Sequence, residues 1–286
     1  MRGLLLVSWL LAACRPAADR AGAVLVTDDA GRPVALAAPA RRIVSLLPSF
    51  TELLFAMGAG DRIVGRTTWC DYPPAARAIP SVGAGLPPNV EAVAARQPDL
   101  VVLYRAGTNV TAAEQLERLG IPTVLFDLNL LEDLGPAARR LGVLTGHGEP
   151  ADSLARVLDG LAAAPPVRTI KSLVFIVWDN PPIVIGAGSY LDRLAALAGG
   201  RNVFHDVSGP SAQVSLETIA VRNPDLIAVL SDSVALPGWA GRREWRAIPA
   251  VREGRFLSLP GSLFGRPGPR AAEAVREMRR LLEAAP

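Results

Sequence analysis

The chain uses one stretch of its sequence twice. Residues 90–103 read VEAVAARQPDLVVL, residues 216–229 read LETIAVRNPDLIAV, and the two stretches align without a gap. The copies lie much farther apart than the roughly 20–45 residues that separate the repeats of a solenoid. The repeat therefore predicts two similar lobes within one chain.

Each copy carries the signals of a short helix, a stop and a buried strand. A polar residue suited to an N-cap, Asn89 or Ser215, precedes a first turn that contains Glu91 or Glu217. A proline then ends the helix, and an apolar run follows that shows no polar alternation. Such runs are typical of parallel sheets covered on both faces, so we expect two Rossmann-like α/β lobes with parallel sheets.

Strand and helix signals alternate around both copies, as in α/β lobes. One long helix is expected between the lobes, because Leu154, Val157, Leu158 and Leu161 form an apolar stripe at helical spacing. We therefore divide the chain into a tether and edge hairpin (15–40), an N-terminal lobe (41–147), a connecting helix (148–166) and a C-terminal lobe (167–286).

Residues 1–14, MRGLLLVSWLLAAC, have the pattern of a bacterial lipoprotein signal peptide. Arg2 precedes an apolar run, and the segment ends in Leu11-Ala12-Ala13-Cys14. The run is shorter than the roughly 20 residues that span a bilayer. We expect export, cleavage before Cys14 and acylation of its thiol, giving a membrane-anchored lipoprotein in the periplasm or another extracytoplasmic space. Cys70 would then be a lone thiol.

Composition and motifs exclude several classes of function. The net charge is +3 and the arginines are scattered, so we expect no nucleic-acid partner. The sequence has no GxSxG elbow and no phosphate-binding loop with a lysine, and Gly186-Ala187-Gly188 is only a fragment of a dinucleotide motif. The two histidines, His147 and His205, lack the spacing of metal ligands. We expect no enzyme, no cofactor and no metal site, and a chain that acts as a monomer.

A series of segments carries a family resemblance. Residues 41–76, RRIVSLLPSFTELLFAMGAGDRIVGRTTWCDYPPAA, are followed by SVG at 81–83 and then by the two repeats. Over roughly residues 41–280 the chain resembles the substrate-binding proteins of ABC importers for cobalamin and iron-siderophores, whose two lobes are joined by one long helix (class III periplasmic binding proteins). The CDYPP portion favours the cobalamin branch.

The resemblance implies a ligand held between the lobes and delivered to a membrane permease with its ATPase. It also implies that Glu91 and Glu217 dock on arginines of the permease. A carboxylate in a first turn also complements the helix dipole, worth about 0.3–1 kcal/mol, but that role does not require a glutamate at the same turn in both lobes.

By position in the family, seven residues are expected to line the cleft. A corrin ring is large, flat and mostly apolar on its faces, so its site should combine aromatic side chains with a few polar anchors. The expected ligand-binding residues are Trp69, Tyr72, Tyr104, Arg105, Trp178, Phe264 and Arg266.

Some departures keep other ligands open. Gly85, Ser211 and Leu263 stand where some cobalamin-binding members carry tryptophan, and Ser262 stands where an acidic residue is expected. The alternatives are another corrinoid, haem or a ferric siderophore. Anionic ferric chelates would favour several inward arginines, whereas a corrinoid favours aromatic residues with few charges. From another class, an extracytoplasmic enzyme or a metal chaperone on the same fold stays open, because fold alone does not fix function.

Overall fold

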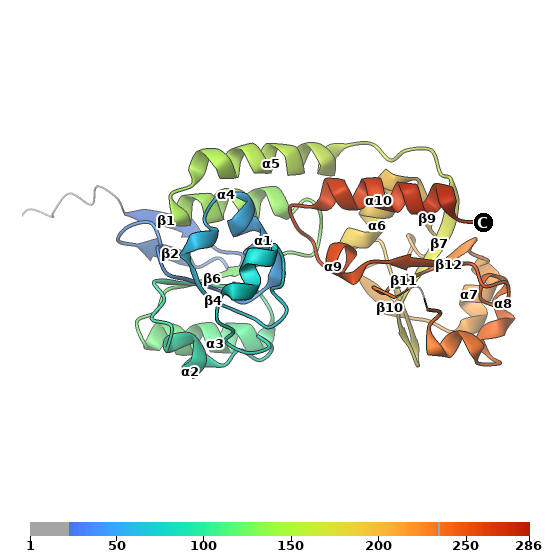
Figure 1. The fold of residues 1–286 in the computed structure, drawn as a ribbon, viewed down its shortest axis with the longest axis horizontal. Helices are drawn as coiled ribbons and strands as arrows, with labels where there is room; N and C mark the ends of the chain where they lie inside the picture. The colour runs from blue at the N-terminus through green and yellow to red at the C-terminus, as the bar shows by residue number, and fades with distance from the viewer. Residues whose placement is uncertain (1–22, 234) are drawn as a thin grey trace, which may run out of the picture.

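The computed structural model describes residues 23–233 and 235–286 and shows two α/β lobes joined beneath a layer of helices (Figure 1). The predicted signal peptide and Cys14 lie outside these residues. Among the residues described, no helix combines the length and the apolar character needed to cross a membrane.

The N-terminal lobe is built on a parallel four-stranded sheet in the order β4-β3-β5-β6. A separate antiparallel hairpin precedes the sheet, as predicted. The apolar run of the first repeat forms β5 and is buried from Leu100 to Leu103, as expected for a strand covered on both faces. The strands are β1 (Val24–Thr27), β2 (Pro33–Leu36), β3 (Ile43–Ser45), β4 (Ile63–Arg66), β5 (Leu100–Tyr104) and β6 (Thr123–Phe126), and the helices are α1 (Pro48–Ala56), α2 (Val90–Ala94), α3 (Gly107–Arg118) and α4 (Leu134–Thr145).

The C-terminal lobe has a six-stranded sheet in the order β10-β8-β7-β11-β12, with β9 beside β7. Strands β7, β9, β11 and β12 are parallel, whereas β8 pairs antiparallel with both β7 and β10. Strands β8 and β10 were not predicted. The strands are β7 (Lys171–Asp179), β8 (Pro182–Ile185), β9 (Gly200–Asn202), β10 (Ser211–Gln213), β11 (Leu226–Leu230) and β12 (Phe256–Leu259), and the helices are α6 (Tyr190–Ala198), α7 (Leu216–Arg222), α8 (Pro249–Arg252), α9 (Gly261–Phe264) and α10 (Ala271–Ala284).

The two repeats fold alike, as α2 followed by β5 and α7 followed by β11. Each helix ends before a residue in the left-handed region, Gln97 at φ 49° and Asn223 at φ 42°, and a proline follows each of them. Left-handed backbone is uncommon outside glycine, so its presence at matching positions identifies the same helix-to-strand turn in both lobes.

The aspartate after each proline anchors the neighbouring strand. Asp99 accepts hydrogen bonds from the backbone N–H groups of Arg41 and Arg42, each at 2.8 Å. Asp225 accepts from the backbone N–H and the hydroxyl of Ser172, each at 2.7 Å. Each repeat thus supplies a strand together with the carboxylate that fixes the start of the next strand in its sheet.

The connecting helix α5 (Gly148–Ala163) packs along α4 of the N-terminal lobe. The fit is close, since a Cβ added at Gly142 would lie 2.3 Å from the Cβ of Ala151. Ala151, Ala155, Leu158 and Ala162 are buried, whereas Val157 of the predicted stripe is 60% exposed. The small residues face α4 because only they allow the two helices to approach so closely.

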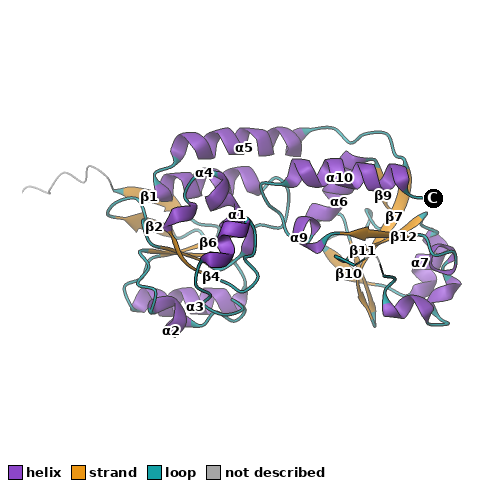
Figure 2. Cartoon of the chain, viewed as in Figure 1, coloured by secondary structure: helices purple, strands orange, loops and turns teal. Residues whose placement is uncertain are grey.

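The two lobes share one hydrophobic core. The helices α4, α5, α6 and α10 lie on the same side of the two sheets (Figure 2). Beneath them, one continuous cluster of buried side chains includes Phe50 and Phe126 from the first lobe and Leu191, Phe264 and Met278 from the second. The opposite face of each sheet has a core of its own, covered by α2 and α3 in the first lobe and by α7 and α8 in the second.

Four charged side chains join the lobes, and we call them the interlobe ion cluster: Glu52, Asp71, Arg266 and Arg270. The Glu52 side chain on α1 is only 2% exposed, and it accepts from Nε and Nη2 of Arg270 at 2.8 and 2.9 Å. Nε of Arg266 lies 3.3 Å from the same carboxylate, and its Nη2 donates to Asp71 at 2.8 Å. Arg270 also lies over the ring of Tyr72, 3.8 Å from its centroid.

The ionisation of these groups follows from their neighbours. Burial alone would raise the pKa of Asp71, but the hydrogen bond and the charge of Arg266 hold it below its usual value. Burial opposes the charge of Arg270, yet the bond to Glu52 raises the pKa of its guanidinium. Burial, and then the charge of Glu52, raises the pKa of the nearby Tyr190 phenol. Asp71 and Arg270 are therefore charged at neutral pH, and Tyr190 is neutral.

We expect Glu52→Gln to lower the free energy of unfolding by about 3–5 kcal/mol, because it leaves two partly buried guanidinium groups without their shared carboxylate. Equilibrium urea denaturation would measure this loss. The matched control is Glu277→Gln, which removes an exposed pair with Arg280 and should cost less than about 1 kcal/mol. Equal losses in the two variants would contradict a joining role for Glu52.

Candidate functional site

A cavity of about 710 Å³ lies between the lobes. It is formed where β3 and β4 of the first lobe and β11 and β12 of the second end, which is the edge of an open α/β sheet where ligands bind. Its volume is in the range of small-molecule sites. The lining residues are Leu46, Leu47, Pro48, Thr67, Thr68, Trp69, Asp71, Ala84 and Leu86 from the first lobe, and Asp232, Gly261, Ser262, Gly265 and Arg266 from the second.

The wall from the N-terminal lobe presents large apolar side chains to solvent. Trp69 is 67% exposed and Leu86 is 60% exposed. Between them, Gly85 has a φ of +86°, and a Cβ there would lie 2.6 Å from Cγ2 of Thr67. A tryptophan does not fit at position 85 on this backbone, so Trp69 and Leu86 supply the exposed apolar surface of this wall.

The two arginines expected to line the site are already paired. Arg266 lines the cavity, but its guanidinium contacts Glu52 and Asp71 and donates to the backbone carbonyl of Trp69 at 3.0 Å. Arg105 forms a two-point ion pair with Asp127, in which Nε lies 3.1 and 3.0 Å from the two carboxylate oxygens.

The charges on the cavity wall do not favour an anion. Of the lining side chains, Arg266 is positive, whereas Asp71 and Asp232 are negative. Asp232 forms no ion pair with any other residue in the described part of the chain. The wall therefore carries an excess of one negative charge, and its single guanidinium is occupied.

Five of the seven expected residues do not line this cavity: Tyr72, Tyr104, Arg105, Trp178 and Phe264. The side chain of Phe264 is 1% exposed and belongs to the shared core, because the short helix α9 turns it inward. It cannot contact a ligand in the cavity, and that expectation is corrected. Trp178 is 59% exposed and lines a smaller cavity of about 290 Å³ with Trp239, where β7 and β11 end.

The two tyrosines are engaged with protein partners. The hydroxyl of Tyr104 donates to Oδ1 of Asn129 at 2.7 Å, and the ring of Tyr72 lies beneath Arg270. The structure thus brings together Trp69 and Arg266 of the seven expected residues. Leu86 and Asp232 were missed, although Asp232 is the second residue after the buried strand β11, near the strand end where ligand-contacting residues of α/β sheets gather.

Cys70 and His147 have structural surroundings. Cys70 is completely buried, and its sulfur lies 3.1 Å from the Thr67 hydroxyl. Nδ1 of His147 lies 3.0 Å from the carbonyl oxygen of Thr145. Within the described ranges, 23–233 and 235–286, no group of histidine, cysteine and acidic side chains has the arrangement of a metal site.

Glu91 and Glu217 occupy matching exposed positions in the first turns of α2 and α7. Helix α2 lies at the end of its lobe farthest from α5, and α7 lies on the outer flank of the second lobe (Figure 1). The Ser215 hydroxyl and the backbone N–H of Glu217 hold the pKa of the Glu217 carboxyl below its usual value. Both lobes therefore present a carboxylate to solvent at the same point of the repeat.

The family match and a curated relative both point to periplasmic binding proteins. Residues 43–263 match the family described as periplasmic binding protein. A protein from Pectobacterium atrosepticum, named vitamin B12-binding protein, is 31% identical over 249 residues, covering 83% of this chain and 87% of its own length.

Solved structures share the fold. The periplasmic vitamin B12 binding protein BtuF of Vibrio cholerae aligns with a TM-score of 0.68 at 26% identity, over 86% of this chain and 97% of its own. The periplasmic heme-binding protein RhuT from Roseiflexus sp. RS-1 aligns with a TM-score of 0.73 at 24% identity, over 85% and 97%, which shows the fold alone. These relatives are binding proteins, not enzymes. The chain, with its two joined α/β lobes and the cavity between them, belongs to the periplasmic binding protein family.

Proposed function

We propose that this protein captures cobalamin or a related corrinoid in the interlobe cavity and delivers it to the permease of an ABC importer. We further propose that acylation of Cys14 anchors it to a membrane outside the cytoplasm. The observation that carries the ligand proposal is the chemistry of the cavity wall, where Trp69 and Leu86 are exposed and the only arginine is engaged. The names of the Pectobacterium and Vibrio relatives support the same ligand class.

Anionic ferric chelates and haem fit this wall less well. Both classes carry carboxylates or similar acidic groups, and these require free cations, whereas Arg266 is held by Glu52 and Asp71. Haem iron also takes an axial ligand from histidine, cysteine, methionine or tyrosine. None of the described residues that line the cavity is of these types. The likeness to a haem-binding protein lies in the fold, not in this donor set.

The ligand proposal is tested by calorimetric titration of the protein that begins after Cys14. Cyanocobalamin should bind with one-to-one stoichiometry, while haem and an anionic ferric catecholate give no saturable heat, because the described lining residues offer no free cation to their negative charges. Binding of an iron chelate together with silence toward cyanocobalamin would move the proposed function to iron uptake.

The role of Trp69 is tested by Trp69→Ala. Loss of its indole from the ligand contact should weaken cyanocobalamin binding by about 1–3 kcal/mol, or roughly 5- to 150-fold in Kd. Leu119→Ala is the control, because Leu119 is 60% exposed at the end of α3 and lies outside the cavity. An unchanged Kd in the Trp69 variant would remove this residue from the site.

Docking on the permease is tested by reversing both repeat carboxylates. The double variant Glu91→Arg and Glu217→Arg should abolish uptake by cells and leave the Kd of the purified protein unchanged, because neither residue lines the cavity. The control reverses two exposed glutamates on the helix layer, Glu149 and Glu283. A loss of ligand binding in the first double variant, or equal uptake in the two, would count against docking.

A further inference from the structure

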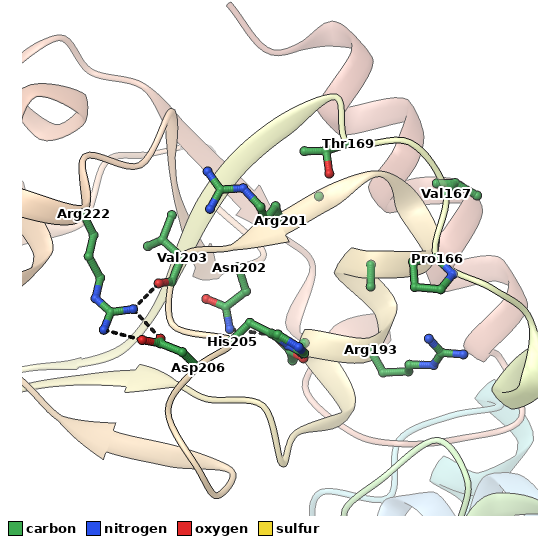
Figure 3. Close-up of a pocket in the computed structure, with 13 residues that line it drawn as sticks. Pro166, Val167, Thr169, Arg193, Arg201, Asn202, Val203, His205, Asp206 and Arg222 are labelled. Carbon is green, nitrogen blue, oxygen red and sulfur yellow. Dashed lines mark hydrogen bonds and ion pairs between the residues drawn. The ribbon is translucent and has the colours of Figure 1, made fainter.

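A second cavity, which we call the C-lobe cavity, has a volume of about 580 Å³ and shares no lining residue with the interlobe cavity. It is enclosed by α6, by β9 with the loop that follows, by the end of α7, and by the linker that leaves α5. Figure 3 shows Arg222 and Arg193 at opposite ends of it, with His205 between them. Pro166, Val167, Ala196 and Val203 supply apolar wall.

A buried polar pair fixes the histidine. The Asp192 side chain on α6 is 7% exposed, and its two oxygens contact Nδ2 of Asn202 at 2.9 Å and Nδ1 of His205 at 2.8 Å. Asn202, itself 4% exposed, also donates to the carbonyl of Ile185 and accepts from the backbone N–H of Phe204. The backbone contacts fix the Asn202 amide, and the amide in turn fixes the Asp192 carboxylate that binds the His205 ring.

This arrangement determines which nitrogen of His205 is available to a ligand. A carboxylate only accepts hydrogen bonds, so Nδ1 carries its proton toward Asp192. The His205 side chain is 71% exposed, and Nε2 has no partner in the described part of the chain. Nε2 is therefore the ring nitrogen that is open to a ligand, and it donates a hydrogen bond only when the ring carries its second proton.

The arginines around the cavity differ in how fully they are engaged. Arg222 pairs with Asp206, with Nη2 and Oδ2 2.9 Å apart, and lies over the Phe204 ring. Arg193 donates to the carbonyls of Ala162 and Ala164, both at 2.6 Å. Arg201 on β9 is exposed and forms no hydrogen bond or ion pair with the described residues, so its guanidinium is free to bind a ligand.

Arg201 is the guanidinium of this cavity that has no acidic partner among the described residues. Arg222 pairs with Asp206, and Nε of Arg193 lies 3.8 Å from Oε1 of Glu132. An anion that enters the cavity therefore meets the unpaired guanidinium of Arg201, whereas the arginine of the interlobe cavity is paired.

We propose that the C-lobe cavity binds a small organic carboxylate. Its carboxylate pairs with the guanidinium of Arg201, in a cavity that His205 also lines, and its apolar body packs against Val167, Ala196 and Val203. An organic anion fits better than inorganic phosphate, because the volume far exceeds that of one phosphate and much of the wall is apolar. The site is independent of the ligand proposed for the interlobe cavity.

The test uses the two histidines of the chain as NMR probes, since His147 lies outside the C-lobe cavity and serves as the internal reference. The protein is titrated at pH 5.5 with benzoate, with its neutral counterpart benzamide and with inorganic phosphate. Benzoate should shift the ring signals of His205 in a saturable way and leave those of His147 unchanged. Arg201→Ala should weaken benzoate binding at least tenfold, because it removes a charged donor.

Arg243→Ala is the matched control, since Arg243 is an exposed arginine of the same lobe that does not line the cavity. It should leave benzoate binding unchanged, and neither variant should alter cyanocobalamin binding. Equal shifts with benzamide, a response to phosphate alone, no shift of His205, or full benzoate affinity in the Arg201 variant would each overturn the proposal. Because Arg201 and Arg243 are both exposed, far-UV circular dichroism should show unchanged folding in both variants.

Discussion

The geometry of the molecule depends on one buried carboxylate. Glu52 is almost completely removed from water on α1, and both arginines that compensate it come from the other lobe. A buried ion pair adds little net stability compared with apolar packing, but a charge left without its partner is costly. The lobes must therefore meet at the one separation that keeps Arg266 and Arg270 in contact with Glu52. Because Arg266 also binds the backbone carbonyl of Trp69, the same contact positions the cavity wall.

Because Arg266 helps to join the lobes, little of its guanidinium is left for a ligand. A guanidinium with two carboxylates and a carbonyl around it has few donors left for a ligand, which is why we propose a ligand held by shape and apolar contact rather than by charge. The same lobe holds free donors elsewhere, at Arg201 and His205. The chain thus separates two kinds of surface: a wall between the lobes with exposed Trp69 and Leu86 and a paired arginine, and a wall within the second lobe on which Arg201 has no acidic partner among the described residues.

The repeat, the edge hairpin and the two α/β lobes could be predicted because they rest on local signals: an N-cap, a proline and an unbroken apolar run. The site could be predicted only in part. Phe264 and Leu263 lie in a helix of four residues, too short for any periodicity to say which side faces inward. Val157 faces solvent because α5 packs its alanines against a glycine of α4. The pattern within α5 alone therefore could not show which of its faces is buried. Pairings such as Glu52 with Arg270 join residues far apart in sequence and follow from no local pattern.

The fit of α5 against α4 has a mechanical meaning. Because Ala151 packs against Gly142, helix α5 is a fixed part of the N-terminal lobe and not a separate connector between the two lobes. It ends at Ala163, and the chain then runs without helix or strand until β7 begins at Lys171. If the lobes turn relative to each other, the backbone rotation falls in residues 164–170, because the chain passes from the first lobe to the second there, whereas Arg266 and Arg270 lie between two helices of the same lobe. The pivot and the ionic lock of this molecule are therefore separate parts of the chain.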